Sequence, residues 1–376
     1  MNQQAAPERT RESMSPERRD IMRFTSGTLG ENWYVAALSD EVKDKQPLAA
    51  TILEEPLVLF RSAKGSPVAL LDRCLHRNAA LSAGQVFDGC IGCPYHGWTY
   101  DADGKCVFVP SEGPKSKGVQ AEAPAGRADR FVESFPARDQ DGLVWVYMGT
   151  PNRATECEPF RFPAVGEGWM SYTMVTDFVG DVTDLVENFM DVPHTSFVHG
   201  GWFRRAGKPK RGEAQVERTR NSVLVDYVMQ GDAIGFTGRI LNPDNRPMTH
   251  TDKFFMPNCT RVDYAWGPTR AFVITSQVTP ITPVRARVYT AITFQFGPLN
   301  WLARIGLPWY TRVVINQDVR IMAVQTANLE RFGRRRFHGT EADAIHRHIE
   351  ALREHALAGE GGDPPAPASD HIAYWL

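Results

Sequence analysis

The chain has 376 residues, of which 42% are hydrophobic and 23% are charged, and its formal net charge is −2. These values are ordinary for a globular protein of one large or two smaller domains. The near-neutral charge argues against a nucleic-acid partner.

The first residues are charged and lack the apolar segment of a secretory signal. The most apolar stretch, residues 298–315, contains Arg304, Pro308 and Arg312, which argues against membrane association. Six cysteines in a chain of this length point to a reducing compartment and to metal or catalytic use. We therefore expect a cytoplasmic protein.

Residues 1–30 are predicted to be a flexible polar segment, followed by an all-β domain over residues 31–150. Two strands flank a turn at Lys64-Gly65, and a hairpin turns at Asp103-Gly104. The apolar run 141–149 is predicted to be a buried closing strand of this domain.

Residues 151–358 are predicted to form a second domain that begins with a connection, a strand and a helical segment at 181–200. Alternating runs then predict an antiparallel meander, at residues 222–231, 232–241, 249–257, 260–267, 270–282 and 285–297. Helices are expected at about 310–332 and 340–357, and residues 359–376 are expected to be a linker and tail. The predicted fold class is α+β, a small all-β domain followed by a large antiparallel sheet flanked by helices.

Two short motifs, Cys74-x-His76 and Cys93-x-x-His96, place one cysteine and one histidine on each of two arms. Two thiolates and two imidazoles are a ligand set for structural zinc. They are equally the set for a Rieske [2Fe-2S] cluster, in which one iron takes both thiolates and the other both imidazoles. The cluster is favoured because both arms lie in predicted tight turns, and no zinc-finger helix is expected there.

The stretches "RCLHR" and "CPYHGWTYDADGKC" resemble the Rieske domain of ring-hydroxylating and related non-haem iron oxygenases. They differ from respiratory Rieske proteins, whose arms carry extra cysteines that form a disulfide, because Cys90 has no partner cysteine beside the first arm. The resemblance implies a [2Fe-2S] cluster on the four arm residues. Cys106, Cys157 and Cys259 are expected to be small buried hydrophobic residues.

A second motif, "ENFMDVPHTSFVHG", contains His194 and His199. Two histidines and a carboxylate form the facial triad that binds mononuclear Fe(II), although two histidines near a helix end are also common surface residues. On a regular helix these two would point about 140° apart, so a break is required, and Pro193 is placed to cause it. Asp191 is three residues before His194 and is placed to orient its imidazole.

The spacing of this motif resembles the iron site of the same oxygenase family. In that family the aspartate connects the iron histidine to a Rieske histidine of the neighbouring subunit, which implies this catalytic role for Asp191. An asparagine lies near the iron without being a firm ligand, which implies Asn188. The third ligand comes from a C-terminal helix, where Asp318 with Gln325 resembles the family pattern; a solvated helix charge and Glu330 are the alternatives.

The resemblance implies the terminal oxygenase component of a Rieske non-haem iron monooxygenase or dioxygenase. It would use O2 to hydroxylate, dealkylate, desaturate or cyclise a small aromatic or apolar substrate. No flavin or nicotinamide fingerprint is present, so electrons would come from a separate ferredoxin or flavin-dependent reductase. A homotrimer is the expected assembly. Two alternatives are a Rieske electron carrier without mononuclear iron, which would not need so large a second domain, and a zinc-binding module.

The sequence says less about partners and substrate. The basic stretches 202–212 and 331–337 are either contacts for an acidic ferredoxin or solvated surface. Phe255, Tyr264 and Trp266 are candidates for the substrate pocket, although aromatic residues in a sheet are more often core. No positive residue in these strands is placed to bind a substrate carboxylate, which favours a neutral or amphipathic substrate.

Overall fold

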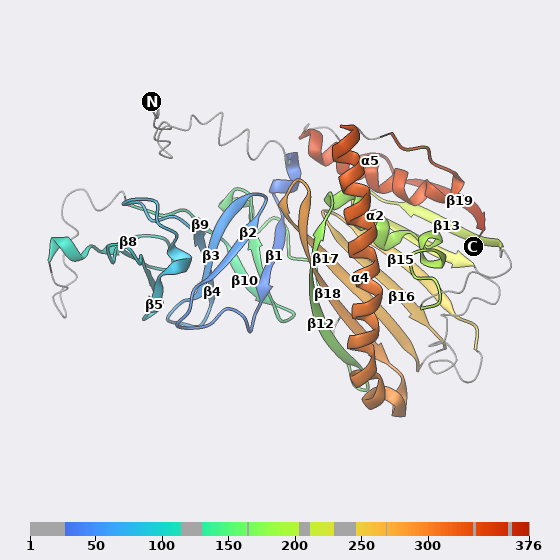
Figure 1. Ribbon diagram of the computed structural model, residues 1–376, viewed down its shortest axis with the longest axis horizontal. Helices are drawn as coiled ribbons and strands as arrows, with labels where there is room; N and C mark the ends of the chain where they lie inside the picture. Colours follow the sequence, from blue (N-terminus) through green and yellow to red (C-terminus); the bar gives the residue numbers. More distant parts are fainter. Residues whose placement is uncertain are drawn as a thin grey trace.

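The computed structural model describes residues 27–113, 130–163, 165–202, 211–228, 246–267, 269–333, 336–359 and 363–375. Figure 1 shows two parts beside each other along the long axis: an all-β N-terminal domain, and a C-terminal domain with a large sheet and helices. The predicted α+β class is confirmed. In the same parts of the chain, no helix is long and apolar enough to cross a membrane.

The described residues of the N-terminal domain form three small antiparallel sheets, with strand orders β1-β11-β10, β2-β3-β4-β9 and β5-β6-β7-β8. Their bounds are β1 Trp33–Leu38, β2 Leu48–Ile52, β3 Glu55–Arg61, β4 Pro67–Leu71, β5 Gln85–Phe87, β6 Cys90–Gly92, β7 Thr99–Tyr100, β8 Cys106–Phe108, β9 Ser134–Phe135, β10 Ala137–Gln140 and β11 Leu143–Tyr147. Both predicted turns are confirmed, because Gly65 and Gly104 adopt φ of 80° and 81° between their strands. Every residue of β11 is buried, as predicted.

The C-terminal domain is built on one antiparallel sheet with the strand order β12-β18-β17-β16-β15-β14-β13-β19 in the described residues. The bounds are β12 Met170–Val179, β13 Arg211–Arg218, β14 Ser222–Val228, β15 Thr249–Phe255, β16 Cys259–Ala265, β17 Ala271–Thr282, β18 Arg285–Gln295 and β19 Ala368–Trp375. The predicted meander is confirmed for β14 to β18, while the predicted run 232–241 lies outside the described residues.

The C-terminal segment is not a tail, so the prediction for residues 359–376 is wrong in its second half. Strand β19 pairs with β13 from Arg211 opposite Trp375 to Arg218 opposite Ala368. Its buried Ile372 and Tyr374 alternate with more exposed residues and join the core. The alternation of buried and exposed residues is short and follows a proline-rich run. For this reason the sequence pattern did not predict the strand.

Three helices lie over one face of the sheet: α2 Val182–Met190, α4 Asn300–Phe332 and α5 Ala344–Ala358 (Figure 1). The predicted start of α4 near residue 310 is wrong, because the helix begins ten residues earlier and continues through Pro308. Proline removes one backbone hydrogen bond. Pro308 lies in the first third of α4, where Leu307 beside it is buried in the core, and the Thr311 hydroxyl donates to the Leu307 carbonyl at 2.7 Å.

The two faces of the sheet serve different purposes because successive side chains of a strand point in opposite directions. On β18, Val288 packs in the core under the helices, whereas Tyr289 packs with Trp33 and Trp145 of the N-terminal domain. The Tyr289 hydroxyl donates to the Ala36 carbonyl at 2.8 Å. The N-terminal domain is thus fixed to one face, and the other face, under α2 and α4, is left to enclose a site.

Candidate metal centres and substrate cavity

The four arm residues lie in two matching turns at one end of the N-terminal domain. Each turn closes on its cysteine, since Asn78 N–H donates to the Cys74 carbonyl at 2.9 Å and Gly97 N–H donates to the Cys93 carbonyl at 3.0 Å. Asn78 and Gly97 both have left-handed backbones, with φ of 59° and 71°. This conformation suits asparagine and glycine and explains these residues at these positions.

Within the turns the cysteines are buried and the histidines are exposed. The His76 and His96 rings lie 4.5 Å apart, and His76 stacks on Trp98 at 5.0 Å with an interplanar angle of 5°. Buried thiolates behind exposed imidazoles suit a cluster in which one iron takes both sulfurs and the outer iron both histidines.

A single zinc ion fits the arms less well. Its four ligand atoms would lie within about 4 Å of one another. Among the residues that the structure describes, three metal-ligating atoms come within 4.8 Å of one another at His194, His199 and Asp318 and not in the arms.

Tyr100 connects the protein core to one cluster thiolate. Its hydroxyl lies 3.3 Å from Cys74 Sγ and accepts a hydrogen bond from Leu75 N–H at 3.1 Å. Burial and the neighbouring thiol raise the pKa of Tyr100. The hydroxyl therefore keeps its proton, and with its oxygen already accepting from Leu75 it is placed to donate to the sulfur.

The second centre forms where α2 ends. Met190 is the last residue of this helix, and a 3₁₀ turn follows at Pro193–Ser196. The predicted break is thus present, and it brings His194 Nε2 and His199 Nε2 within 3.2 Å of each other. Asp318, on α4, places Oδ1 3.6 Å from His194 Nε2 and 3.2 Å from His199 Nε2.

These three atoms fit a metal ion. Ligands about 2.1 Å from an ion, on one octahedral face, lie about 3 Å apart. Asp318 is buried, and its Oδ1 has no hydrogen-bond partner among the described residues although it faces two imidazoles. Burial opposes ionisation, yet the two histidines lower the pKa of Asp318. Burial likewise opposes the charged form of His194, but the carboxylates of Asp191 and Asp318 raise its pKa to about 9. The site is therefore organised to hold positive charge.

The two triad histidines differ at their other ring nitrogen. Asp191 Oδ2 lies 3.6 Å from His194 Nδ1, which has no hydrogen-bond partner among the described residues, so this carboxylate faces the imidazole as a nearby charge. His199 Nδ1 lies 2.9 Å from Gln317 Oε1, and because an amide oxygen only accepts, Nδ1 carries the proton and Nε2 is left to bind metal. Sequence reasoning missed Gln317; its one signal is its position directly before Asp318. Asn188 lines the cavity, and its buried Oδ1 has no partner among the described residues.

A cavity of about 130 Å³ lies between the sheet and helices α2 and α4, with the triad in its wall. A cavity of about 150 Å³ is known to hold benzene, so this volume suits about one aromatic ring. The lining is largely apolar and includes Met174, Phe189, Val262, Phe272, Ile274 and Ile292.

Of the three predicted pocket residues, Tyr264 lines the cavity. Phe255 does not, because strand alternation turns it to the opposite face, where it packs on Phe160 at 5.1 Å. Trp266 follows the end of β16 and is buried in the core near Phe296, so it too is outside the cavity lining.

The remaining predicted residues are placed as follows. Cys106 and Cys259 are buried, and Cys157 is half-buried. All six cysteines lie in the described residues, and none of them forms a disulfide there. Residues 203–210 of the first basic stretch and 334–335 of the second lie outside the described residues.

Comparison with known proteins agrees with this arrangement. Residues 32–136 match the Rieske [2Fe-2S] domain, and residues 181–358 match the Vanillate O-demethylase oxygenase C-terminal domain. The chain belongs to the Rieske non-haem iron oxygenase family. The first match covers both cysteine–histidine arms, and the second covers His194, His199 and Asp318.

Individual relatives of this Rieske protein were found by sequence. The oxygenase component of dicamba O-demethylase from Stenotrophomonas maltophilia is 39% identical over 172 residues, or 44% of this chain and 46% of that protein. Aminopyrrolnitrin oxygenase PrnD from Pseudomonas fluorescens is 35% identical over 172 residues, or 46% of each chain. The matched region thus spans less than half the length of these curated relatives.

Solved structures share the fold over most of the chain. Dicamba monooxygenase bound to dicamba superposes with a TM-score of 0.71 at 24% identity, covering 88% of this chain and 99% of that one. NdmA of Pseudomonas putida CBB5 with caffeine also has a TM-score of 0.71, at 20% identity, covering 92% and 98% of the two chains. At these identities the likeness concerns the fold.

Replacing Tyr100 with phenylalanine is expected to lower the reduction potential of the Rieske cluster. A hydrogen bond to a ligand sulfur favours the more negative reduced state, and its loss, at about 1 kcal/mol, corresponds to roughly 50 mV for one electron. Potentiometry followed by EPR measures this, with Tyr34→Phe, remote from the cluster, as control. An unchanged potential would mean that the hydroxyl does not donate to Cys74.

Replacing Gln317 with leucine is expected to weaken binding of the mononuclear metal by roughly 10–100-fold, because His199 loses the acceptor that fixes its ring. Gln325→Leu, on the same helix, is the matched control. Titration of the apo site with Fe(II) or Co(II) measures the affinity. Equal affinities of both variants and the parent protein would contradict the positioning role.

Proposed function

We propose that this protein is the terminal oxygenase component of a Rieske non-haem iron system that uses O2 to oxidise a small aromatic or apolar compound. The observation that carries the proposal is the buried triad of His194, His199 and Asp318 in the wall of a largely apolar cavity. Mononuclear iron held there would supply O2 activation at positions left open by three protein ligands.

The chain itself would bind the substrate, orient it and keep water out. Apolar side chains from β12, β16, β17 and β18 form the floor under the triad, so a ring would be held by burial against them. The hydroxylation, dealkylation, desaturation or cyclisation outcome would depend on which substrate carbon this floor presents to the triad.

An electron carrier without mononuclear iron is the less favoured function. An electron carrier does not require three metal-ligating side chains that converge in the wall of an apolar cavity.

Exposed groups at the cluster loops support a docking role. His76 and His96 lie at the surface, and the side chains next to them, Leu75 and Tyr95, are 42% and 63% exposed. An apolar rim around exposed imidazoles suits contact with a protein partner. We propose that this surface contacts two kinds of partner, one after the other. One is a ferredoxin or flavin-dependent reductase, and the other is a second copy of the chain.

The arrangement of the two domains supports a homotrimer. In Figure 1 the cluster loops lie near β5 and β8 at one end, and α2 lies in the other half of the molecule. A second cleft, bordered by α2, α4 and α5, is lined by Asp191 and His194 together with Asp184, Glu187 and Glu350. Asp191 therefore lies between a triad histidine and a surface cleft, where the cluster loops of a neighbouring subunit would dock.

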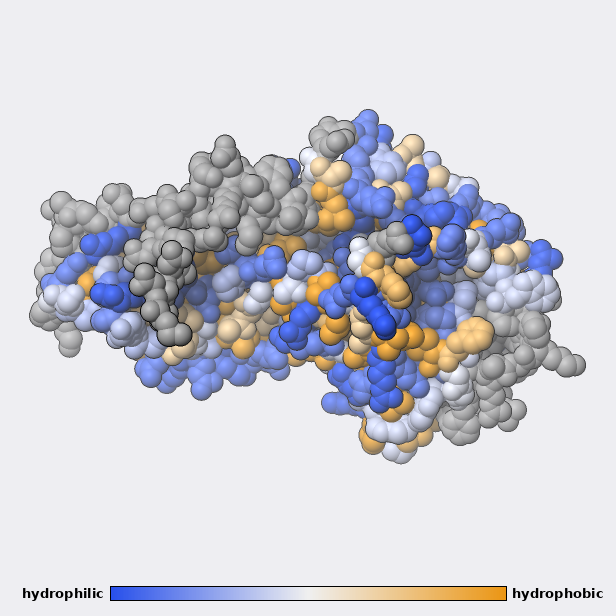
Figure 2. All heavy atoms as spheres, turned by 45° about the horizontal axis from the view of Figure 1, so that its top comes forward, coloured by the Kyte–Doolittle hydropathy of each residue, from blue (hydrophilic) through white to orange (hydrophobic). Residues whose placement is uncertain are grey.

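The remaining proposals concern the location of the protein and the surfaces that contact its redox partner. Figure 2 shows that hydrophilic side chains dominate the visible surface and that apolar ones are exposed in separate patches. Six described cysteines that form no disulfide, together with a thiolate-bound cluster, suit the cytoplasm. The two basic stretches remain candidate contacts for an acidic ferredoxin.

Replacing His194 with alanine is expected to abolish O2-dependent product formation with a surrogate ferredoxin and reductase, while the visible and EPR spectra of the Rieske cluster stay unchanged. The expected loss is at least 100-fold, because two ligands do not retain the metal. His371→Ala, an exposed histidine of the same domain, is the control. Retained turnover in the His194 variant would contradict the proposal.

Two inactive variants, Cys93→Ala without a cluster and His194→Ala without mononuclear metal, are expected to restore activity when co-assembled. Mixed trimers would pair an intact cluster of one subunit with an intact triad of its neighbour. Turnover of co-expressed and separately purified variants measures this. A trimer without restored activity would mean that electrons pass within one chain, and a monomer would contradict the assembly itself.

A further inference from the structure

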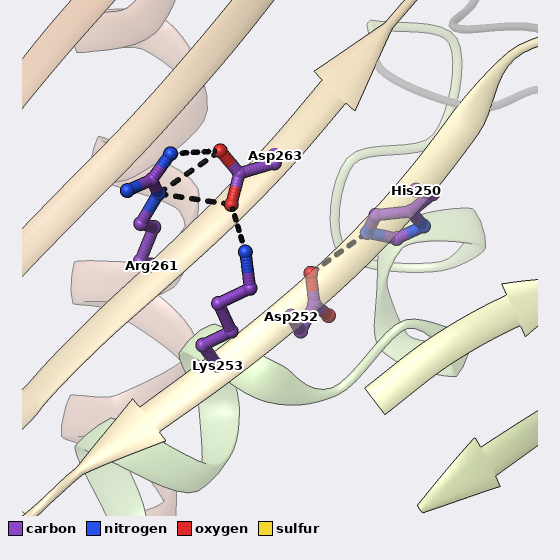
Figure 3. A network of polar contacts seen from close by, with 5 residues as sticks. All are labelled: His250, Asp252, Lys253, Arg261 and Asp263. Atoms are coloured by element: carbon purple, nitrogen blue, oxygen red, sulfur yellow. Dashed lines mark hydrogen bonds and ion pairs between the residues drawn. The ribbon is translucent and has the colours of Figure 1, made fainter. Parts of the chain in front are cut away.

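Asp252 is a carboxylate in the cavity wall that the proposed metal site does not use. It lies on β15, is 2% exposed and lines the same cavity as the triad. His250, on the same face of the strand, has Nε2 2.8 Å from Asp252 Oδ1 (Figure 3). Because an ionised carboxylate only accepts hydrogen bonds, Nε2 is the donor.

This pair is rigidly held. The His250 ring stacks between Tyr227 and Tyr264, with ring centroids 4.4 Å and 4.3 Å away and interplanar angles of 18° and 26°. The Tyr227 hydroxyl donates to the Met190 carbonyl at 3.3 Å, which connects the stack to the end of α2. Burial and then the Asp252 carboxylate raise the pKa of Tyr227, so its hydroxyl stays protonated beside the pair.

The cations on β15 and β16 face away from the cavity. Lys253 and Arg261 lie on the opposite face of the sheet, where both bind Asp263, at 3.1 Å and 2.6 Å (Figure 3). Among the described residues that line the cavity, none is lysine or arginine. Strand alternation thus gives two carboxylates on neighbouring strands different roles, Asp263 in a surface ion network and Asp252 in the cavity.

The surroundings of Asp252 across the sheet are apolar. Its register partner on β16 is Val262, which in turn lies opposite Ile274 of β17. Beside this row runs a row of neutral hydroxyls, Thr260, Ser276 and Thr290. Two other carboxylates line the cavity, and both face triad histidines.

A carboxylate has about four acceptor sites on its two oxygens, so the bond from His250 and the contact with the Tyr227 hydroxyl still leave acceptor capacity at Asp252. In a largely apolar cavity that capacity favours a ligand N–H or O–H and disfavours a second anion.

We propose that Asp252, positioned by His250, selects the substrate: a single-ring compound that carries a hydroxyl or amino hydrogen-bond donor and no carboxylate. The proposal rests on the cavity being the substrate site, as in the proposed function. It goes further in assigning a specificity residue and the polar group that it recognises.

Binding of four matched probes to the anaerobic holoprotein tests this by calorimetry: 2-methoxyphenol, 2-methoxyaniline, 1,2-dimethoxybenzene and 2-methoxybenzoate. The two donor-bearing rings are expected to bind about tenfold more tightly than dimethoxybenzene, the size of one charge-assisted hydrogen bond. The benzoate is expected to bind at least tenfold more weakly than the phenol. Equal affinities, tightest binding of the benzoate, or no binding of any probe would each overturn the proposal.

Asp252→Asn keeps the shape and removes the charge. It is expected to bring the affinities for the phenol and dimethoxybenzene within about threefold of each other and to strengthen benzoate binding, because an amide N–H donates to a carboxylate. Asp263→Asn, the matched change on the other face, is expected to keep the parent preferences. An Asp252 variant with unchanged preferences would overturn the assignment. Turnover is assayed separately, so tight, selective binding without O2-dependent turnover would contradict the proposed function and leave the role of Asp252 standing.

Discussion

The C-terminal domain depends on one electrostatic constraint: the carboxylate of Asp318 is buried on α4 opposite two imidazoles. A buried carboxylate is strongly unfavourable unless positive charge or hydrogen bonds compensate it. Here the compensation comes from a chain segment that stops being helical at Met190 and turns, so that both Nε2 atoms face the same oxygen. A bound metal ion would also compensate the buried carboxylate, since it would supply the positive charge that a proton on His194 otherwise provides.

The two faces of the sheet connect the triad of His194, His199 and Asp318 to the rest of the molecule. One face carries Tyr289 and its neighbours against the N-terminal domain, and the other presents the cavity floor to α2 and α4. Cross-domain hydrogen bonds, such as Thr279 Oγ1 to the Val35 carbonyl at 2.7 Å, attach the cluster domain to the strands that line the cavity. The two centres therefore occupy fixed positions on one scaffold, with the cluster loops exposed and the triad enclosed.

The two cluster arms and the His194–His199 pair could be predicted as candidate ligands because each lies in a short, spaced motif, whereas Asp318, about 120 residues further along the chain, was indicated only by the family resemblance. The cysteine and histidine arms and the His194–His199 pair need only local turns, and Asn78, Gly97 and Pro193 identify those turns. The residues around the ligands could not be predicted in this way. Whether Phe255 or its neighbours face the cavity depends on the register of β15, and a shift of one residue reverses the answer. Gln317 depends on the rotation of α4, and β19 on a pairing with a strand about 150 residues away in the chain.

The central claim is that one chain holds both a two-iron cluster and a separate mononuclear metal ion. Iron and acid-labile sulfide per chain, determined on anaerobically purified and iron-loaded protein, test it most directly. The account predicts about three irons to two sulfides, with one iron lost and both sulfides kept in Asp318→Ala. About two irons to two sulfides in fully loaded protein, unchanged by that substitution, would contradict it.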